Sequence, residues 1–289
     1  MSLGLKNRAE AFAAVRAFFS SKNILEVDTP ILSPYAPIDT HIDIFEVLEG
    51  GYLHSSPEYG MKKLLAEGSG DIYQLGHVFR KGEMGLLHRP EFTMIEWYRC
   101  NVSFEQFLEE NLDLCSLFLG NIPCEILSYR EAFLKYLGIS HDRPFPELLQ
   151  VARSKGIEIE DTSDLLNLLW GCLIEPNLGQ EGITIITHYP KEQAALAQTT
   201  MIDGEEVSER FEIYFKGIEL GNGYHELTDS KEQKSRLLKW NEERKALGKK
   251  PFPLDPEFLK ALEKGVPDCY GIALGFDRLL MLKNGQSHL

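Results

Sequence analysis

The fold of this chain is decided by residues 71–99, DIYQLGHVFRKGEMGLLHRPEFTMIEWYR. Two runs rich in branched and aromatic residues flank a polar, glycine-containing stretch at residues 81–89, which predicts two antiparallel strands and their loop. Because side chains alternate along a strand, one face of the second run carries Phe92, Met94, Glu96 and Tyr98. An aromatic ring, a carboxylate and a phenol on one face suit a stacked base and a bound cation. A half-buried hairpin containing an ion pair explains the same pattern.

The remaining elements are widely spaced along the chain. We expect an amphipathic helix over residues 9–19, extended chain at 27–32, where Pro30 disfavours helix, and a helix beginning at Ser56-Pro57-Glu58, where Ser56 can cap it. Further expected elements are a mostly helical stretch at 104–178, strands at 184–187 and 211–220, and a charged helix at 230–247. Since strands and helices do not alternate regularly, the sequence predicts an α+β fold built on an antiparallel sheet flanked by helices. We expect one domain over residues 1–289, with a mostly helical insertion at about 104–180.

Composition excludes several classes of protein. Lys and Arg number 30 against 44 Asp and Glu, a formal charge of −14 that argues against broad, non-specific nucleic-acid binding. One local basic cluster, Arg244, Lys245, Lys249 and Lys250, is explained equally well by a solvated helix end. The sequence has no apolar run near the length of a membrane span and no secretory signal. Its five cysteines lie far apart without metal-ligand spacing, so we expect reduced thiols in a cytoplasmic protein without structural zinc.

Residues 271–275, GIALG, predict a buried strand with an unusual face. Gly271, Ala273 and Gly275 share one side, so either a ligand lies close against the backbone or a helix packs tightly there. Arg278 follows where the next helix would begin, and a guanidinium at a helix start suits a phosphate. The sequence contains neither a phosphate-binding G-x-x-x-x-G-K-[ST] loop nor a G-x-G-x-x-G turn, so any phosphates must be held by side chains and metal.

Two carboxylates in residues 215–226, FKGIELGNGYHE, form a candidate metal site. Glu219 and Glu226 flank a Gly-Asn-Gly sequence that we expect to bend and bring them together. Carboxylates combined with nucleotide phosphates suit Mg²⁺, although acidic turns are common in proteins without a metal.

Taken together, these segments resemble the three signature motifs of class II aminoacyl-tRNA synthetases. Residues 27–34 resemble motif 1, residues 79–99 motif 2 and residues 271–282 motif 3. Residues 92–98 and 219–229 are more similar to the lysyl branch, and most similar to its paralogues that attach β-lysine to elongation factor P. The resemblance runs through nearly the whole chain, including residues 56–58, 175–177 and 267–269.

The resemblance implies a role for each matched residue. Arg80 and Arg278 would be catalytic, holding the α- and γ-phosphates, and Phe92 would stack under adenine. The full ATP-binding set would be Arg80, Lys81, Gly82, Glu83, His88, Arg89, Phe92, Glu219, Leu220, Gly275 and Arg278. The amino acid would contact Ser56, Pro57, Glu58, Glu96, Tyr98, Glu226 and Ala273, and Mg²⁺ would bind Glu219 and Glu226.

The implied activity is ATP-dependent formation of a β-lysyl or lysyl adenylate, followed by transfer to a lysine side chain of elongation factor P. Clustered carboxylates match a diammonium substrate, and the attacking carboxylate needs no general base. The chain starts close to motif 1, so we expect no anticodon-binding domain and no tRNA acceptor. The helix before motif 1 resembles the family's dimer-forming element, so we expect a homodimer.

The chain departs from the family pattern at several places. Gly82 stands where motif 2 usually has Glu, with Glu83 one residue later, and relatives generally continue with a further helix after motif 3. Ala273 occupies a position that is usually Gly in true lysyl synthetases and Ala in the elongation-factor ligases. Two alternatives stay open: a ligase of the same chemistry with another acceptor, and a catalytically degenerate paralogue acting as a regulator.

Overall fold

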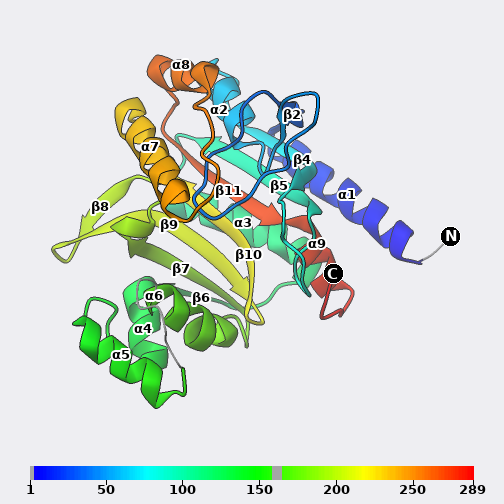
Figure 1. The fold of residues 1–289 in the computed structure, drawn as a ribbon. Helices are drawn as coiled ribbons and strands as arrows, with labels where there is room; N and C mark the ends of the chain where they lie inside the picture. Colours follow the sequence, from blue (N-terminus) through cyan, green and yellow to red (C-terminus); the bar gives the residue numbers. More distant parts are fainter. Residues whose placement is uncertain (1–2, 158–164) are drawn as a thin grey trace. The chain divides into compact units, whose positions relative to one another are not determined.

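The structure, a computed structural model, describes residues 3–157 and 165–289. The chain forms two compact units, one of Met1–Asn121 with Gly223–Leu289 and the other of Ile122–Asn222 (Figure 1). Within the described ranges, no helix is both long enough and apolar enough to cross a bilayer.

The first unit contains the predicted hairpin and the predicted buried strand. Its sheet places four strands side by side in the order β1 (Leu25–Glu26), β4 (Ile72–Phe79), β5 (Glu91–Cys100) and β11 (Cys269–Gly275). The β4–β5 and β5–β11 pairs are antiparallel, and β1 runs parallel to β4. A separate antiparallel pair consists of β2 (Leu32–Ser33) and β3 (Tyr52–Leu53). The sheet is therefore mixed rather than wholly antiparallel, and the α+β class is confirmed.

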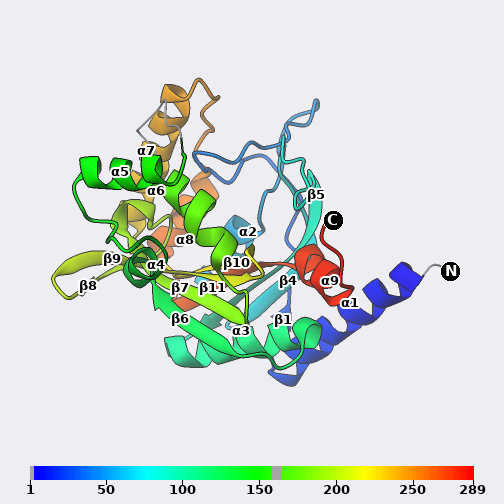
Figure 2. The ribbon, with the colours of Figure 1, turned by 90° about the horizontal axis from the view of Figure 1, so that it is seen from below.

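One face of β5 forms the core of this unit. The helices α1 (Leu3–Ser21), α3 (Phe104–Leu119) and α9 (Phe276–Lys283) gather on one side of the sheet (Figure 2). Trp97 is fully buried there, with ring centroids 5.4 Å from Phe19 of α1 and 5.9 Å from Phe107 of α3. Because side chains alternate along a strand, the residues between these core positions point to the other face, where the candidate site lies.

Three further helices belong to the first unit: α2 (Glu58–Ala66), α7 (Ser230–Ala246) and α8 (Pro256–Lys264). Tyr59 of α2 stacks on Phe258 of α8 with centroids 3.9 Å apart, so these two helices pack side by side (Figure 1). Helix α2 begins at Glu58, one residue later than predicted, and the Glu58 N–H donates to the Ser56 hydroxyl at 3.0 Å.

The second unit has its own sheet and aromatic core. Strands β7 (Ile183–Pro190) and β8 (Thr199–Ile202) pair with β9 (Glu205–Phe215), and β6 (Cys124–Ser128) pairs in parallel with β7. Its helices are α4 (Tyr129–Leu137), α5 (Phe145–Ser154) and α6 (Leu165–Leu169), followed by short π and 3-10 turns up to Asn177. Tyr129 stacks on Trp170 at 4.5 Å in this core. The predicted helices at 104–178 are thus confirmed in the described part of that stretch, whereas strand β6 within it was not predicted.

Strand β10 (Ile218–His225) contains the Gly-Asn-Gly sequence, so the prediction of a bend there is wrong. The chain turns instead at Lys216 and Gly217, whose φ angles are 53° and 69°. Glycine weakens a strand but does not prevent it, so Gly221 and Gly223 can lie within β10. Glu219 and Glu226 therefore lie at the two ends of an extended segment and are not folded toward one point.

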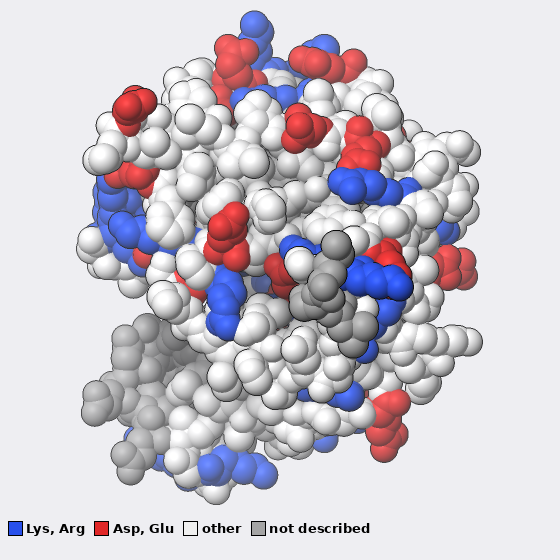
Figure 3. Space-filling model, turned by 90° about the vertical axis from the view of Figure 1, so that its right-hand side faces the viewer, with Lys and Arg blue, Asp and Glu red and all other residues white. Residues whose placement is uncertain are grey.

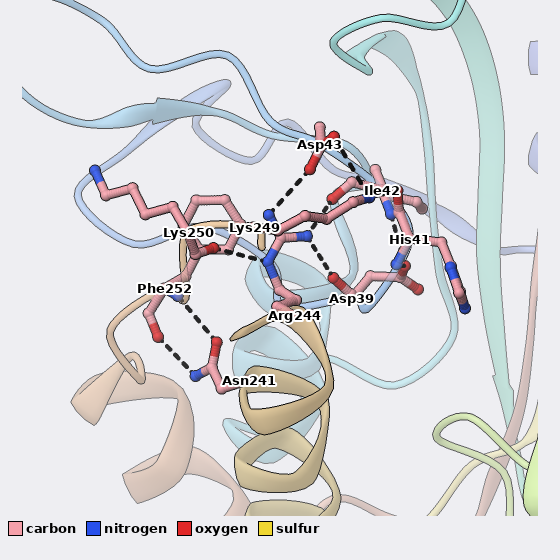
Figure 4. Close-up of polar contacts among 9 residues, drawn as sticks. All are labelled: Asp39, His41, Ile42, Asp43, Asn241, Arg244, Lys249, Lys250 and Phe252. Atoms are coloured by element: carbon pink, nitrogen blue, oxygen red, sulfur yellow. Dashed lines mark hydrogen bonds and ion pairs between the residues drawn. The ribbon is translucent and has the colours of Figure 1, made fainter. Parts of the chain in front are cut away.

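The cluster of basic residues near the end of α7 is paired with carboxylates. Arg244 is only 2% exposed and contacts Asp43, and Lys245 contacts Glu242. Lys249 also reaches Asp43, and Lys250 pairs with Glu46. Figure 4 shows Arg244 pointing into the loop at residues 39–43. On the face in Figure 3, Lys and Arg side chains lie among Asp and Glu side chains, in keeping with the acidic composition.

Candidate active site

Two neighbouring strands of the first unit provide the floor of the site. In the β5–β11 register, Met94 pairs with Gly275, Glu96 with Ala273 and Tyr98 with Gly271. Directly opposite residues of an antiparallel pair point to the same face, so the small-residue face of β11 lies beside the Phe92–Tyr98 face of β5. The long side chains of β5 therefore have room to extend over β11.

Gly271 explains why part of this face must be small. A Cβ at this position would lie 2.3 Å from Glu226 Oε1 and 2.5 Å from the Tyr98 ring. At Gly275, a Cβ would make only ordinary contact with Arg278, at 3.5 Å. The close approach predicted from the sequence is thus made at Gly271 by two side chains of the predicted amino-acid site, not by a packed helix.

Glu96 is the central carboxylate of the site and is only 3% exposed. The Ser56 hydroxyl donates to Glu96 Oε2 at 2.7 Å, and the Tyr98 hydroxyl donates to Oε1 at 2.8 Å. Burial, together with the negative charge of Glu58, raises the pKa of Glu96 to about 8, and these two donors oppose that rise. The carboxyl therefore holds a proton near neutral pH unless a cation approaches it.

Lys62 links the other two carboxylates and was missed by the sequence analysis. Its Nζ lies 2.6 Å from Glu58 Oε1 and 2.6 Å from Glu226 Oε2, and the residue is only 1% exposed. Burial acts to lower the pKa of Lys62, but the two carboxylates outweigh it and hold this pKa above its usual range. The available signal was the spacing of four residues from Glu58, which places both on one face of a helix.

The cluster has an excess of negative groups. Burial raises the pKa of Glu226 to about 7, despite the opposing charge of Lys62. Lys62 pairs with Glu58 and Glu226, and the negative charges of both also act on Glu96, so full ionisation of these four groups would leave two net negative charges. Isolated buried charge is costly, and protons partly neutralise this cluster when no ligand is bound. A ligand carrying two ammonium groups would complete the neutralisation.

Arg80 and Phe92 lie together at the loop end of the hairpin. The Arg80 guanidinium is 5.1 Å from the centroid of the Phe92 ring, and its Nη1 is 3.8 Å from Glu83 Oε1. Gly82 has φ = 83°, a conformation that a glutamate adopts only with strain. The loop therefore places its carboxylate one residue later than the family pattern, and Glu83 approaches Arg80 from there.

Arg278 approaches the same loop from the first turn of α9. Its Nη2 lies 3.0 Å from His88 Nε2, and burial followed by the charge of Arg278 lowers the pKa of His88. The neutral imidazole can then accept a hydrogen bond from Arg278. Arg89 donates to the carbonyls of Gly85 and His88 at 2.7 and 3.0 Å, and thus braces the loop in this structure.

Asp277 and Arg8 fix α9 to β5 and were also missed by the sequence analysis. Asp277 Oδ2 accepts from the Thr93 N–H at 2.7 Å, and Asp277 Oδ1 lies 2.5 Å from Arg8 Nη1. Arg8 also donates to the Thr93 hydroxyl at 2.7 Å. These bonds hold the helix start that carries Arg278 against the strand that carries Phe92.

The remaining predicted residues divide between the units. Pro57 immediately precedes α2, Lys81 begins the loop after β4, and Glu219 and Leu220 lie on the part of β10 that belongs to the second unit. Among residues 3–157 and 165–289, no group of three or more His, Cys, Asp or Glu side chains gathers to hold a metal. Mg²⁺ bound mainly through nucleotide phosphates needs only one or two carboxylates, so this arrangement is compatible with it. The metal role of Glu226 stays a prediction, and here Lys62 contacts its carboxylate.

The chain is similar to known proteins over nearly its whole length. The family model for class II tRNA synthetases (D, K and N) covers residues 1–289. A relative from Haemophilus ducreyi, named elongation factor P–(R)-β-lysine ligase, is 43% identical over 298 residues, which cover 99% of this chain and 91% of the relative. Proteins of the same name from Salmonella typhi and Pasteurella multocida are also 43% identical, over 99% and 96% of this chain and 92% and 90% of theirs.

Proposed function

Because the chain belongs to the class II tRNA synthetase family (D, K and N), we propose that it activates (R)-β-lysine with ATP and transfers it to elongation factor P. Family membership and the ligase relatives make the chain an ATP-dependent ligase. The identity of the amino acid and of the acceptor is carried over from the names of the relatives.

The buried carboxylate cluster is the observation that carries this proposal. Glu58 and Glu226 share the ammonium of Lys62, and their negative charges act on Glu96, which stands on the strand that also carries Phe92. A substrate with two ammonium groups supplies the missing positive charge, and one with an apolar side chain does not. A site of this charge would therefore favour a lysine-like amino acid.

The first step is attack of the substrate carboxylate on the α-phosphorus of ATP. A bond forms between the carboxylate oxygen and this phosphorus, the bond to the bridging oxygen of the β-phosphate breaks, and pyrophosphate leaves with the electron pair. Arg80 would stabilise the charge that develops on the α-phosphate, and Arg278 would hold the γ-phosphate. Mg²⁺, when bound with ATP, supplies further charge neutralisation on the phosphates, with Glu219 as its proposed carboxylate.

In the second step, a neutral lysine ε-amine of the acceptor attacks the carbonyl carbon of the adenylate. The new amide bond forms, AMP leaves, and the amine loses a proton. Neither step requires a nucleophile from the enzyme, so catalysis rests on orientation and on charge stabilisation.

Ala273 is proposed to set the preference for the β-amino acid. It lies directly opposite Glu96 in the strand register, so its methyl group occupies the floor beside the central carboxylate. One methyl group in a pocket typically changes discrimination by about 1–3 kcal/mol, which suits the choice between two positions of an amino group.

Pyrophosphate exchange with purified protein tests the proposal. We expect exchange to depend on (R)-β-lysine far more than on α-lysine, and exchange with α-lysine alone would exclude the proposed substrate. Arg80→Ala should abolish exchange while circular dichroism stays unchanged, and near-normal exchange in this variant would refute the role of Arg80. Incubating the pre-formed adenylate with elongation factor P and with tRNA in separate reactions identifies the acceptor.

A further inference from the structure

Arg244 has an unusual position for a residue at the end of an exposed, charged helix. It lies in the last turn of α7 and is 2% exposed. Its Nε donates to the Lys250 carbonyl at 2.9 Å, and its Nη1 donates to the carbonyls of Asp39 and Ile42 at 2.8 and 2.9 Å (Figure 4). Its Nη2 lies 3.0 Å from Asp43 Oδ1. Three of these four acceptors thus belong to the loop at residues 39–43.

The chemistry of this contact requires an arginine. A guanidinium stays charged at every accessible pH and presents its donors in a fixed fork, whereas a lysine has one point charge and three donors on one atom. The Arg244 guanidinium also stacks over Phe252 at 4.4 Å, and Phe252 exchanges two backbone hydrogen bonds with the Asn241 side chain. The fork is therefore held rigidly and defines the position of the loop at residues 39–43.

This loop in turn supports the backbone next to Arg80. The β4–β5 pairing ends at Phe79 and Glu91, so Arg80 lies beyond the last paired residue of its strand. The Arg80 N–H donates to the Pro90 carbonyl at 2.9 Å, and the Lys81 N–H donates to the Asp43 carbonyl at 2.7 Å. Asp43 therefore makes two contacts: its backbone carbonyl binds the Lys81 N–H that follows Arg80, and its carboxylate binds Arg244.

We propose that Arg244 is a positioning residue for Arg80 and acts through Asp43 and Lys81. This inference rests on the proposed function for the identity of the reaction but not for the contact itself. Arg244 orders the 39–43 loop, the loop fixes Lys81, and the preceding residue presents its guanidinium to the α-phosphate. Loss of the fork displaces Arg80 without altering the acidic cluster, which is built on α2, β5 and the residues around Glu226.

The test compares Arg244→Lys with the control variant Arg236→Lys. Arg236 lies on the same helix and pairs with Glu232 one turn away. Displacement of a catalytic group by about 1 Å can reduce a rate by roughly 10²-fold, so Arg244→Lys should lower kcat for pyrophosphate exchange by about ten- to a hundredfold. The KM for (R)-β-lysine should stay unchanged, and Arg236→Lys should match the wild type. Equal kcat in the two variants would overturn the proposal, as would a loss confined to the KM for the amino acid.

A double-mutant comparison separates positioning from general stability. In an Arg80→Lys background, adding Arg244→Lys should cost less than about twofold in kcat, because the group it positions is already changed. The same loss in both backgrounds would show that Arg244 does not act through Arg80. If Arg244→Lys does not fold, Asp43→Asn, which weakens the ion pair and keeps the backbone carbonyl, provides the same comparison.

Failure of the proposed function can be distinguished from failure of this inference. If the wild-type protein shows no exchange with either lysine isomer, the substrate assignment fails, and calorimetric titration with ATP and Mg²⁺ still tests Arg244. Weaker ATP binding in Arg244→Lys than in Arg236→Lys supports the positioning role, and equal binding overturns it.

Discussion

Replacement of Glu96 by glutamine tests the electrostatics of the site without any substrate. Glutamine has the shape of the protonated carboxyl, but it cannot ionise. The ordinary pKa of a glutamate is 4.5, and in the folded protein the pKa of Glu96 is about 8. At pH values between 4.5 and 8, Glu96 keeps its proton in the native state but has released it in the unfolded state. The stability of the wild-type protein relative to the variant must therefore fall as pH rises from 4.5 to 8, and level off above 8.

The size of the effect follows from the pKa difference. Each unit corresponds to about 1.4 kcal/mol, so the interval from pH 6 to pH 8 accounts for at most about 3 kcal/mol. Solvent screening removes little of this because Glu96 is only 3% exposed. Glu226, whose pKa is about 7, is present in both proteins and largely drops out of the comparison.

Urea unfolding of the wild type and Glu96→Gln at pH 6 and pH 8 measures this difference. We expect the variant to gain about 2 kcal/mol relative to the wild type between the two pH values, less than the maximum because Glu96 is half ionised at pH 8. Glu109→Gln, at an exposed position on α3, serves as the matched control and should show no such change. An equal difference between wild type and Glu96→Gln at both pH values would refute the conclusion that Glu96 is protonated near neutral pH.

The same proton should control substrate binding. An ammonium group favours the ionised carboxyl, so the wild-type kcat/KM for (R)-β-lysine should rise between pH 6 and pH 8 as Glu96 loses its proton more readily. Glu96→Gln should bind the substrate poorly and lack this part of the pH profile. Exchange rates measured at limiting amino-acid concentration provide the profile for both proteins.

Three other predictions concern the strand floor of the site and the assembly. Gly271→Ala would place a methyl group against Glu226 and Tyr98, so we expect a loss of about 1–3 kcal/mol in unfolding free energy and a raised KM for the amino acid, and unchanged values would contradict the packing argument. Ala273→Gly should shift the ratio of exchange kcat/KM toward α-lysine by about 10–200-fold, and an unaltered ratio would remove Ala273 from specificity. The resemblance of the first helix to the family's dimer-forming element predicts a homodimer, which light scattering should detect as twice the chain mass; a monomer would refute it.

The strands that carry the site could be predicted because their signals are local. Alternation in residues 91–100 fixed which side chains share a face, and the glycine-containing loop fixed the hairpin. The small-residue face at Gly271 correctly indicated a close approach. What approached it could not be predicted, because Glu226 and Tyr98 reach Gly271 only through strand pairing.

The missed residues share a different physical origin. Lys62 has one local signal, its spacing of four residues from Glu58. Its contact with Glu226 and the contacts of Asp277 and Arg244 join residues distant in sequence, which no local pattern shows. The Gly-Asn-Gly sequence predicted a bend because its composition is typical of a turn, whereas the strand continues through it. A charged helix end likewise suggested solvent-facing residues. The fold instead buries Arg244, which binds the loop at residues 39–43.

The extended form of β5 has a consequence for how such an enzyme can change its substrate. Residues on one face repeat about every 7 Å, so Phe92 and Glu96 are separated by a fixed interval of roughly 13 Å along the strand. Under the proposed function, the nucleotide would lie near Phe92 and the amine near Glu96, at different points on one rigid strand with Met94 between them. A substitution near Glu96 or Ala273 would then alter amino-acid selection without moving the groups proposed to hold ATP. Variation at one end of the strand and constancy at the other would allow one adenylating scaffold to serve acceptors and amino acids of several kinds.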